Sequence, residues 1–180
     1  MEYRWLDLKK KPIWIHCKGY LVRDDNMKPL YMIGCVNEIG ERQKADNVSG
    51  LLGETGFREY MDQQDTPLEK GYLLRIGIDH FKEINDNFGQ EYGDFVLKKT
   101  AECISGCTSE GQKVYKLVAD EFLILDVSSA EVKDADKLYD KGREAIDRFI
   151  ETNEFKVMYT VSGGIVPFAA LKGNQYAEAL

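Results

Sequence analysis

The sequence has few of the residues that mark secreted, membrane or zinc-binding proteins. Its 180 residues include four cysteines, none of them in a CxxC pair, and two histidines. Neither a disulfide framework nor a cysteine-histidine metal site is therefore expected. The longest apolar runs are about half a dozen residues, far short of a membrane-spanning helix, and no signal peptide is visible at the start. These absences predict a reduced, cytoplasmic chain with no membrane contact in this segment.

Positive charge is scarce as well. The chain carries 24 lysines and arginines against 31 aspartates and glutamates, which gives a net charge of −7. Proteins that bind a nucleic-acid backbone present a basic face, so a nucleic acid is not expected as the partner. A nucleotide is not excluded, because one phosphate site needs only local donors and a metal ion.

Three common catalytic motifs are also missing. The sequence contains no GxxxxGKS or GxxxxGKT phosphate loop, no GxSxG elbow and no HExxH pair, so the chemistries that depend on them find no support. Hydrophobic residues nevertheless make up 43% of the chain, which is enough to build the core of one domain with an appendage.

Residues 1–40 are predicted to form three antiparallel strands. Ile13, Ile15 and Cys17 alternate with Trp14, His16 and Lys18, which is the period of a strand. Three strands are too few to close an independent core, so the segment is expected to begin inside a domain. It resembles the last three strands of a PAS sensor domain, including the ending from Met32 to Gln43. The alternative is an edge meander that belongs to the following domain.

Residues 48–180 are predicted to form an α+β domain, joined to the first segment by a polar linker at 41–47. Apolar residues recur with period two over 72–78, and the order of elements that follows is β-α-α-β-β-α-β. This order favours a mainly antiparallel sheet of ferredoxin or palm type flanked by helices. Residues 118–121 would form the tip of a hairpin. The domain is expected to be truncated at its C-terminal end, Leu180.

Two stretches carry the strongest functional signal. Residues 71–94 read GYLLRIGIDHFKEINDNFGQEYGD, and residues 114–122 read VYKLVADEF. The pair resembles the GGDEF family, the diguanylate cyclase domains of bacterial signalling proteins, whose fold is the palm-like sheet given above. Residues 46–57 also resemble the opening motif of that family, D-x-L-T-G-L-x-N-R-x-x-F. The resemblance covers about residues 46–180.

The resemblance implies a phosphoryl transfer that joins two GTP molecules, one per domain of a dimer, into cyclic di-GMP. It implies Mg²⁺ as the cofactor, a guanine nucleotide as the ligand and a homodimer in the full-length protein. Asp120 and the backbone carbonyl of Ile78 would hold the metal ion. Asp120 and Glu121 would be the catalytic acids.

Nucleotide binding is assigned by the same resemblance to Asn85, Asp94, Phe81 and Lys82. A carboxylate such as Asp94 can accept the N1–H and N2–H₂ donors that guanine presents side by side. The alternatives are structural. Asp94 would be a helix-start carboxylate favoured by the helix dipole, and Asn85 would be a turn residue.

The chain departs from the family pattern where the metal and the phosphates would lie. Gly77 stands at the position of the first metal-binding aspartate, and Val118 and Ala119 replace two glycines. Asp79 lies on the same strand face as Gly77 and is the remaining candidate metal ligand, with the N-cap of the helix near His80 as its alternative role. Val118 is β-branched and disfavours the positive φ that glycine permits.

The inhibitory product site of the family, R-x-x-D, would fall at residues 109–112, where neither charge is present. Together these departures predict a degenerate GGDEF domain that binds a guanine nucleotide weakly and acts as a regulatory module of a bacterial sensory protein. Two alternatives stay open. The first is an active diguanylate cyclase with an unusual metal site, and the second is a dimerisation module that binds no nucleotide.

Overall fold

The computed structural model describes most of the chain, which divides into two compact units, Met1–Lys44 and Ala45–Leu180. The described residues are 2–6, 12–24, 26–39, 45–64, 68–128, 131–152, 155 and 157–171, with the backbone alone described for 2–6, 12–16 and 37–39. Residues 40–44, which belong to the predicted linker and to the end of the PAS-like motif, lie outside the described residues.

The first unit is an antiparallel sheet in the order β1-β2-β3. Its strands are β1 (Glu2–Leu6), β2 (Pro12–Arg23) and β3 (Pro29–Ile39). The side chain of Asp24 closes the β2–β3 hairpin by accepting hydrogen bonds from the backbone N–H groups of Asn26 and Lys28. Large apolar side chains of this hairpin are exposed, among them Tyr20 (75%) and Met32 (73%). The assignment of this sheet to a PAS domain stays a prediction.

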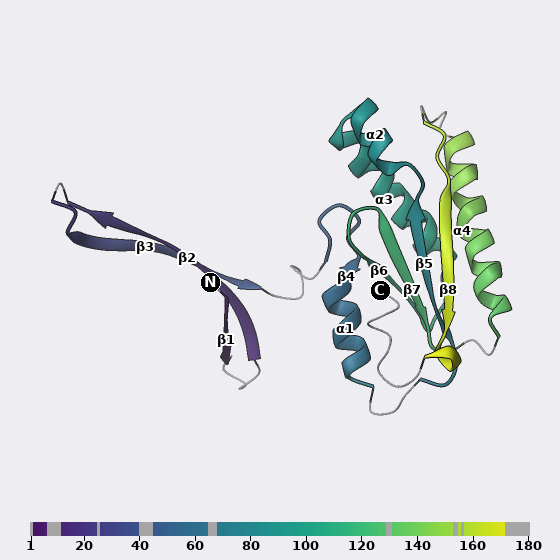
Figure 1. Ribbon diagram of the computed structural model, residues 1–180, viewed down its shortest axis with the longest axis horizontal. Coiled ribbons are helices and arrows are strands. Elements are labelled where there is room, and N and C mark those ends of the chain that lie inside the picture. The colour runs from purple at the N-terminus through teal and green to yellow at the C-terminus, as the bar shows by residue number, and fades with distance from the viewer. Residues whose placement is uncertain are drawn as a thin grey trace. The chain divides into compact units, whose positions relative to one another are not determined.

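The second unit contains a five-stranded sheet in the order β4-β6-β7-β5-β8 (Figure 1). Its strands are β4 (Leu52–Gly53), β5 (Tyr72–Ile78), β6 (Gln112–Lys116), β7 (Glu121–Asp126) and β8 (Val161–Pro167). The β4–β6 pair is parallel and the other three pairs are antiparallel. The mainly antiparallel sheet expected from the sequence is therefore confirmed, as a mixed sheet with one parallel pair.

Helices cover both faces of this sheet. They are α1 (Glu54–Asp62), α2 (Phe81–Phe88), α3 (Gln90–Cys107) and α4 (Lys133–Thr152), and a short 3₁₀ turn, η2 (Phe168–Ala170), follows β8. Leu74 and Ile76 pack with α3 and α4 on one face, whereas Leu73 packs with α1 on the other. This division follows from the alternation of side chains along β5. Among the described residues, no helix is long and apolar enough to cross a membrane.

Two expectations about the helix ends are wrong. Helix α3 begins at Gln90 rather than at Asp94, because Gly89 adopts φ 84° and lets α3 start directly after α2. Asp94 thus lies in the second turn of α3, where its helix-start role is lost. The N-cap of α2 is His80, in the left-handed region with φ 56°, and no side chain caps this helix. Asp79 is therefore not an N-cap.

Candidate functional site

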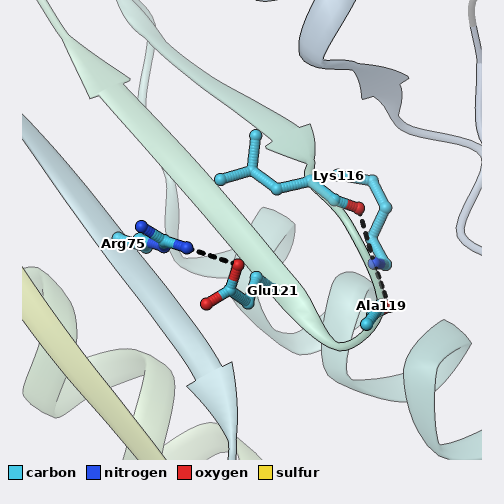
Figure 2. Close-up of polar contacts among 5 residues, drawn as sticks. Arg75, Lys116, Ala119 and Glu121 are labelled. Atoms are coloured by element: carbon cyan, nitrogen blue, oxygen red, sulfur yellow. Dashed lines mark hydrogen bonds and ion pairs between the residues drawn. The ribbon is translucent and has the colours of Figure 1, made fainter. Parts of the chain in front are cut away.

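Residues 117–120 join β6 to β7 at one end of the sheet, so the predicted hairpin tip is present but shifted by one residue, and Glu121 begins β7 (Figure 2). The left-handed conformation falls on Ala119, with φ 55°, and Val118 keeps a negative φ. The expected conflict between the β-branched Val118 and a positive φ is therefore absent, because the turn requires positive φ at its second position alone. Alanine tolerates this region at a cost that glycine would not have.

A buried lysine fastens this tip. Lys116 is 5% exposed, and its Nζ donates hydrogen bonds to the backbone oxygens of Leu117, at 3.0 Å, and of Ala119 (Figure 2). The same ammonium group lies 5.2 Å from the centroid of the Phe122 ring. The sequence analysis missed this role, although a single lysine at the end of a short buried strand is the signal that could have indicated it.

The ammonium group of Lys116 interacts electrostatically with carboxylates from two parts of the domain. Burial lowers the pKa of Lys116, and the negative charges of Asp46, Asp120 and Glu121 oppose this shift. Asp46 also accepts hydrogen bonds from the backbone N–H and the hydroxyl of Ser49, both at 2.7 Å. Burial would raise the pKa of Asp46, but the bonds from Ser49 and the charge of Lys116 outweigh this and lower it. The opening motif and the hairpin tip thus share one electrostatic network.

The end of β5 lies beside the tip. Gly77 pairs with Glu121 in the β5–β7 register. A Cβ atom built on Gly77 would lie 3.9 Å from Asp120 Oδ2 and 3.9 Å from Glu121 Cγ, which is ordinary contact. The position of the missing aspartate therefore faces the retained one. Glu121, however, is engaged, because its Oε2 lies 2.6 Å from Nη2 of Arg75 (Figure 2).

Asp79 is turned towards β8. Its Oδ2 accepts a hydrogen bond of 2.5 Å from the Thr160 hydroxyl, and its backbone N–H donates to the Thr160 carbonyl at 2.9 Å. Hydrogen bonds from the side chains of Thr160 and Ser162 lower the pKa of Asp79. This arrangement gives Asp79 a structural role in joining β5 to β8.

The side chains present supply only part of the magnesium site that the resemblance implies. Mg²⁺ requires oxygen ligands in near-octahedral geometry and is usually held by one or two carboxylates. Of the predicted ligands, Asp120 and the carbonyl of Ile78 would remain, Gly77 supplies no carboxylate, and Asp79 is bonded to Thr160. In the part of the chain that the structure describes, no group of three or more histidine, cysteine, aspartate or glutamate side chains could hold a metal ion.

The predicted base-binding residues lie on α2 and α3, and these two helices pack closely. A Cβ atom on Gly93 would lie 1.9 Å from Asn85 Oδ1 and 3.3 Å from Cζ of Phe81. Asn85 and Phe81 are one helical turn apart on α2 and meet α3 next to Asp94. The turn role considered for Asn85 is wrong, because Asn85 lies within α2. Sequence analysis did not single out Gly93, the residue that permits this contact.

Asn85 carries a further sign of an incomplete site. Its Oδ1 is buried and has no hydrogen-bond partner among the described residues. A buried acceptor without a partner costs about 1–3 kcal/mol, and a donor on a ligand would remove that cost. Asp94 is half-buried and Lys82 is exposed, so both side chains are accessible to a nucleotide.

A cavity of about 210 Å³ lies elsewhere on α2. Its lining includes Asp79, His80, Glu83, Met158 and Thr160. Apart from Asp79, it contains none of the predicted nucleotide- or metal-binding residues. The cavity therefore borders the predicted metal site at Asp79 but contains none of the predicted nucleotide-binding residues.

Comparison with known proteins gives a consistent result. The family model for the diguanylate cyclase GGDEF domain matches residues 43–180. The diguanylate cyclase DgcZ of Escherichia coli (strain K12) is 30% identical over 128 residues, which are 69% of this chain and 43% of that protein. The chain thus spans less than half the length of this relative.

Solved structures agree in fold. The diguanylate cyclase SiaD of Pseudomonas aeruginosa, solved with its activator SiaC, matches with a TM-score of 0.64 and 22% identity over 77% of this chain and 54% of that one. The GGDEF domain of TpbB (YfiN) from the same species matches with a TM-score of 0.58 and 27% identity over 67% of this chain and 73% of that one. Topology, motif spacing and family match converge on one conclusion: this chain belongs to the GGDEF family, the domains of cyclic-di-GMP signalling proteins.

Proposed function

We propose that this chain is a guanine-nucleotide-binding GGDEF module with impaired catalysis, which regulates a larger signalling protein. This proposal rests on a contrast within the candidate site, between its base-binding residues and its metal-binding position. Asn85 offers a buried acceptor without a partner beside Asp94, whereas Gly77 leaves the metal site without its first carboxylate.

Base recognition would rest on α2 and α3. The carboxylate of Asp94 can accept both N1–H and N2–H₂ of guanine, and Oδ1 of Asn85 can accept a further donor. Adenine presents no N1–H to Asp94, so adenine nucleotides should bind more weakly, since a site built for a polar edge rejects a base that lacks it. Phe81, packed against Gly93, would support the base at the same place.

Phosphate recognition would contribute less. The side chains of Val118 and Ala119 occupy space that two glycines would leave open, and the backbone oxygens of Leu117 and Ala119 are bonded to Lys116. The remaining oxygen ligands do not make a two-carboxylate magnesium site. We therefore expect guanine-nucleotide binding in the range of about micromolar to millimolar dissociation constants, with a small preference for GTP over GDP.

Calorimetry with GTP, GDP and ATP tests this proposal. Asp94→Ala should remove most of the guanine preference, because it removes the acceptor for two donors. Asp86→Ala is the matched control, since Asp86 is an exposed acid on α2, and it should leave binding unchanged. Equal heats for GTP and ATP, or no loss on Asp94→Ala, would contradict the proposal and favour a dimerisation module without nucleotide.

The competing function is an active cyclase, and Asp120 is the residue that favours it, because the tip retains this acid beside position 77. We expect no detectable cyclic di-GMP from GTP and Mg²⁺ in the full-length protein, since the loss of one acidic metal ligand removes several kcal/mol (about 3 or more) of transition-state stabilisation. Steady turnover that Asp120→Ala abolishes would establish the cyclase instead.

A further inference from the structure

Helix α2 has a different neighbour on each side. Asn85 faces α3, where a Cβ on Gly93 would lie 1.9 Å from its Oδ1. Glu83 and Asn87 lie on the opposite side of the helix and line the cavity of about 210 Å³, whose other wall is the segment 157–160 before β8. The helix is therefore in close contact with α3 on one side and borders empty space on the other.

The inner surface of the cavity is largely apolar. Its apolar lining consists of Ile84, Phe88, Val157, Met158 and Tyr159. Ile84 and Tyr159 are buried, whereas Phe88 is 47% and Met158 79% exposed. A ligand that covers these two exposed side chains would remove apolar surface from water, which is favourable. The volume is below the about 300–1,000 Å³ of pockets that hold drug-sized ligands, so the cavity suits a smaller molecule.

The polar lining favours a cation over an anion. It consists of Asp79, His80, Glu83, Asn87 and Thr160. Two of these side chains are carboxylates, and no lysine or arginine is among the described residues that line the cavity. Hydrogen bonds from neighbouring side chains lower the pKa of Asp79, so its charge is present at neutral pH. A phosphate group would meet like charge here, which argues against a second nucleotide site in the cavity.

Both carboxylates keep acceptor capacity for a ligand. Glu83 Oε1 lies 3.0 Å from Nδ1 of His80, and both side chains are exposed. Asp79 Oδ2 accepts a hydrogen bond of 2.5 Å from Thr160. Because an ionised carboxylate has about four acceptor sites on its two oxygens, each of these bonds can persist while an ammonium group donates to the same carboxylate.

We propose that this cavity binds a small organic cation, which is an ammonium group carried on an apolar body. The ammonium group pairs with the carboxylates of Asp79 and Glu83. The apolar body lies against Ile84, Phe88 and Met158, whose exposed surface it covers. Neither the base-binding residues nor the hairpin tip takes part in this site.

An occupied cavity would act on nucleotide binding through α2. The contact of Asn85 with Gly93 prevents the helix from moving closer to α3, so the direction left open to it is into the cavity. A ligand that fills the cavity removes this freedom and holds Asn85 beside Asp94. The cation and a guanine nucleotide should therefore strengthen the binding of one another. This regulatory step rests on the proposed function, whereas the cation site does not.

Titration with phenethylamine, followed by the backbone amide resonances of the protein, tests the site without nucleotide. Amides of α2 and of residues 157–160 should shift with a dissociation constant of about 1 mM or below. Amides of α1, which covers the other face of the sheet, should not shift. Phenethyl alcohol, which lacks the charge, and hydrocinnamate, which has the opposite charge, should bind about tenfold more weakly. No shift with phenethylamine, or equal affinity for either analogue, would overturn the proposal.

Two substitutions at exposed positions separate charge recognition from apolar contact. Glu83→Gln should weaken phenethylamine binding by about threefold and leave phenethyl alcohol unaffected, because the ammonium group alone loses a partner. Met158→Ala should weaken both compounds by a similar factor. The matched control is Asp86→Asn, an exposed acid of α2 that does not line the cavity, and it should change neither affinity. Equal effects of Glu83→Gln and Asp86→Asn on phenethylamine would overturn the proposal.

Calorimetry with GTP, in the presence and absence of phenethylamine, tests the regulatory step. Saturating phenethylamine should raise the affinity for GTP by about threefold, and GTP should raise the affinity for phenethylamine by the same factor, because coupling is reciprocal. Glu83→Gln at the same phenethylamine concentration controls for ion pairing with GTP in solution and should show a smaller gain. An unchanged GTP affinity while the amide shifts show an occupied cavity would overturn the regulatory step. If GTP does not bind at all, the proposed function fails, and the amide titration still decides the cation site.

Discussion

The two halves of the candidate site are built by different parts of the fold. The base half depends on the contact of α2 with α3, where a Cβ on Gly93 would lie 1.9 Å from Asn85 Oδ1. The phosphate half depends on strand ends, where a Cβ on Gly77 would make only ordinary contacts. Residues of the base half are thus fixed by packing, whether or not a ligand binds. Residues of the phosphate half can change without disturbing the core.

Because of this difference, the presence of the base-binding motif is not by itself evidence that a nucleotide binds. The glycine at position 93 is required by the fold whether or not guanine binds, so its presence alone is no argument for binding. The buried Oδ1 of Asn85 is a better argument, because packing alone would favour an apolar side chain over an acceptor without a partner. The tip is determined by charge rather than by packing, since Arg75 and Lys116 supply fixed positive charge beside Asp120 and Glu121.

The sharpest way to test the packing of the base half is to place the same substitution at two points of α3. Gly93→Ala should destabilise the domain by about 3 kcal/mol, at the upper end of overpacking costs, because the Cβ would meet Asn85 at 1.9 Å. Gly106→Ala should stabilise it by up to about 1 kcal/mol, since nothing lies within 4 Å of a Cβ there. Urea unfolding of both variants measures the difference. Equal changes in the free energy of unfolding would mean that α2 can move away from α3 without cost.

In the phosphate half, the largest effect is expected at Lys116. Lys116→Met should destabilise the domain by about 1–2 kcal/mol, because two tip carbonyls lose a charged donor and three carboxylates lose a nearby positive charge. Lys113→Met, at an exposed position of the same strand, is the control and should change stability by less than about 0.5 kcal/mol. Unfolding curves near neutral pH give both values. A Lys116→Met variant as stable as the wild type would show that the bonds to the tip are not needed.

A smaller gain is expected from relieving the tip. Ala119→Gly should stabilise the domain by about 0.5–1 kcal/mol, since glycine adopts the observed φ of 55° without a steric cost. Val118→Gly should give no gain, because the φ of Val118 is negative. Thermal unfolding of the two variants separates the positions. A gain at Val118 instead would mean that the turn has another geometry in solution.

The sequence predicted the parts of this molecule that depend on local pattern. The period-two strand at 72–78, the hairpin tip and the antiparallel sheet follow from neighbouring residues, and all three are present. The sequence did not predict the start of α3, because the positive φ of Gly89 alone lets α3 follow α2 directly. The ion pair of Arg75 and Glu121 was missed because it joins residues 46 positions apart, and only the β5–β7 register brings them together.

The bond between Thr160 and Asp79 was missed for the same reason, because the two residues are 81 positions apart. Hydrogen bonds from Thr160 and Ser162 lower the pKa of Asp79 in the folded protein below the ordinary value of 3.8. The stability that these bonds provide is therefore fully present above the unfolded pKa, and it is lost as the pH falls through the lower, folded pKa. The effect is small, because the side chain is largely exposed to solvent.

Asp79→Asn should therefore weaken the acid dependence of unfolding. Urea unfolding from neutral pH down to below the unfolded pKa should show a gap between the wild type and the variant that closes at the acid end. Thr160→Val removes the donor instead of the acceptor, and it should reproduce part of the same flattening. Because both changes act on one bond, the double variant should add little to either single variant. Additive effects would mean that the bond between Asp79 and Thr160 does not account for the acid dependence.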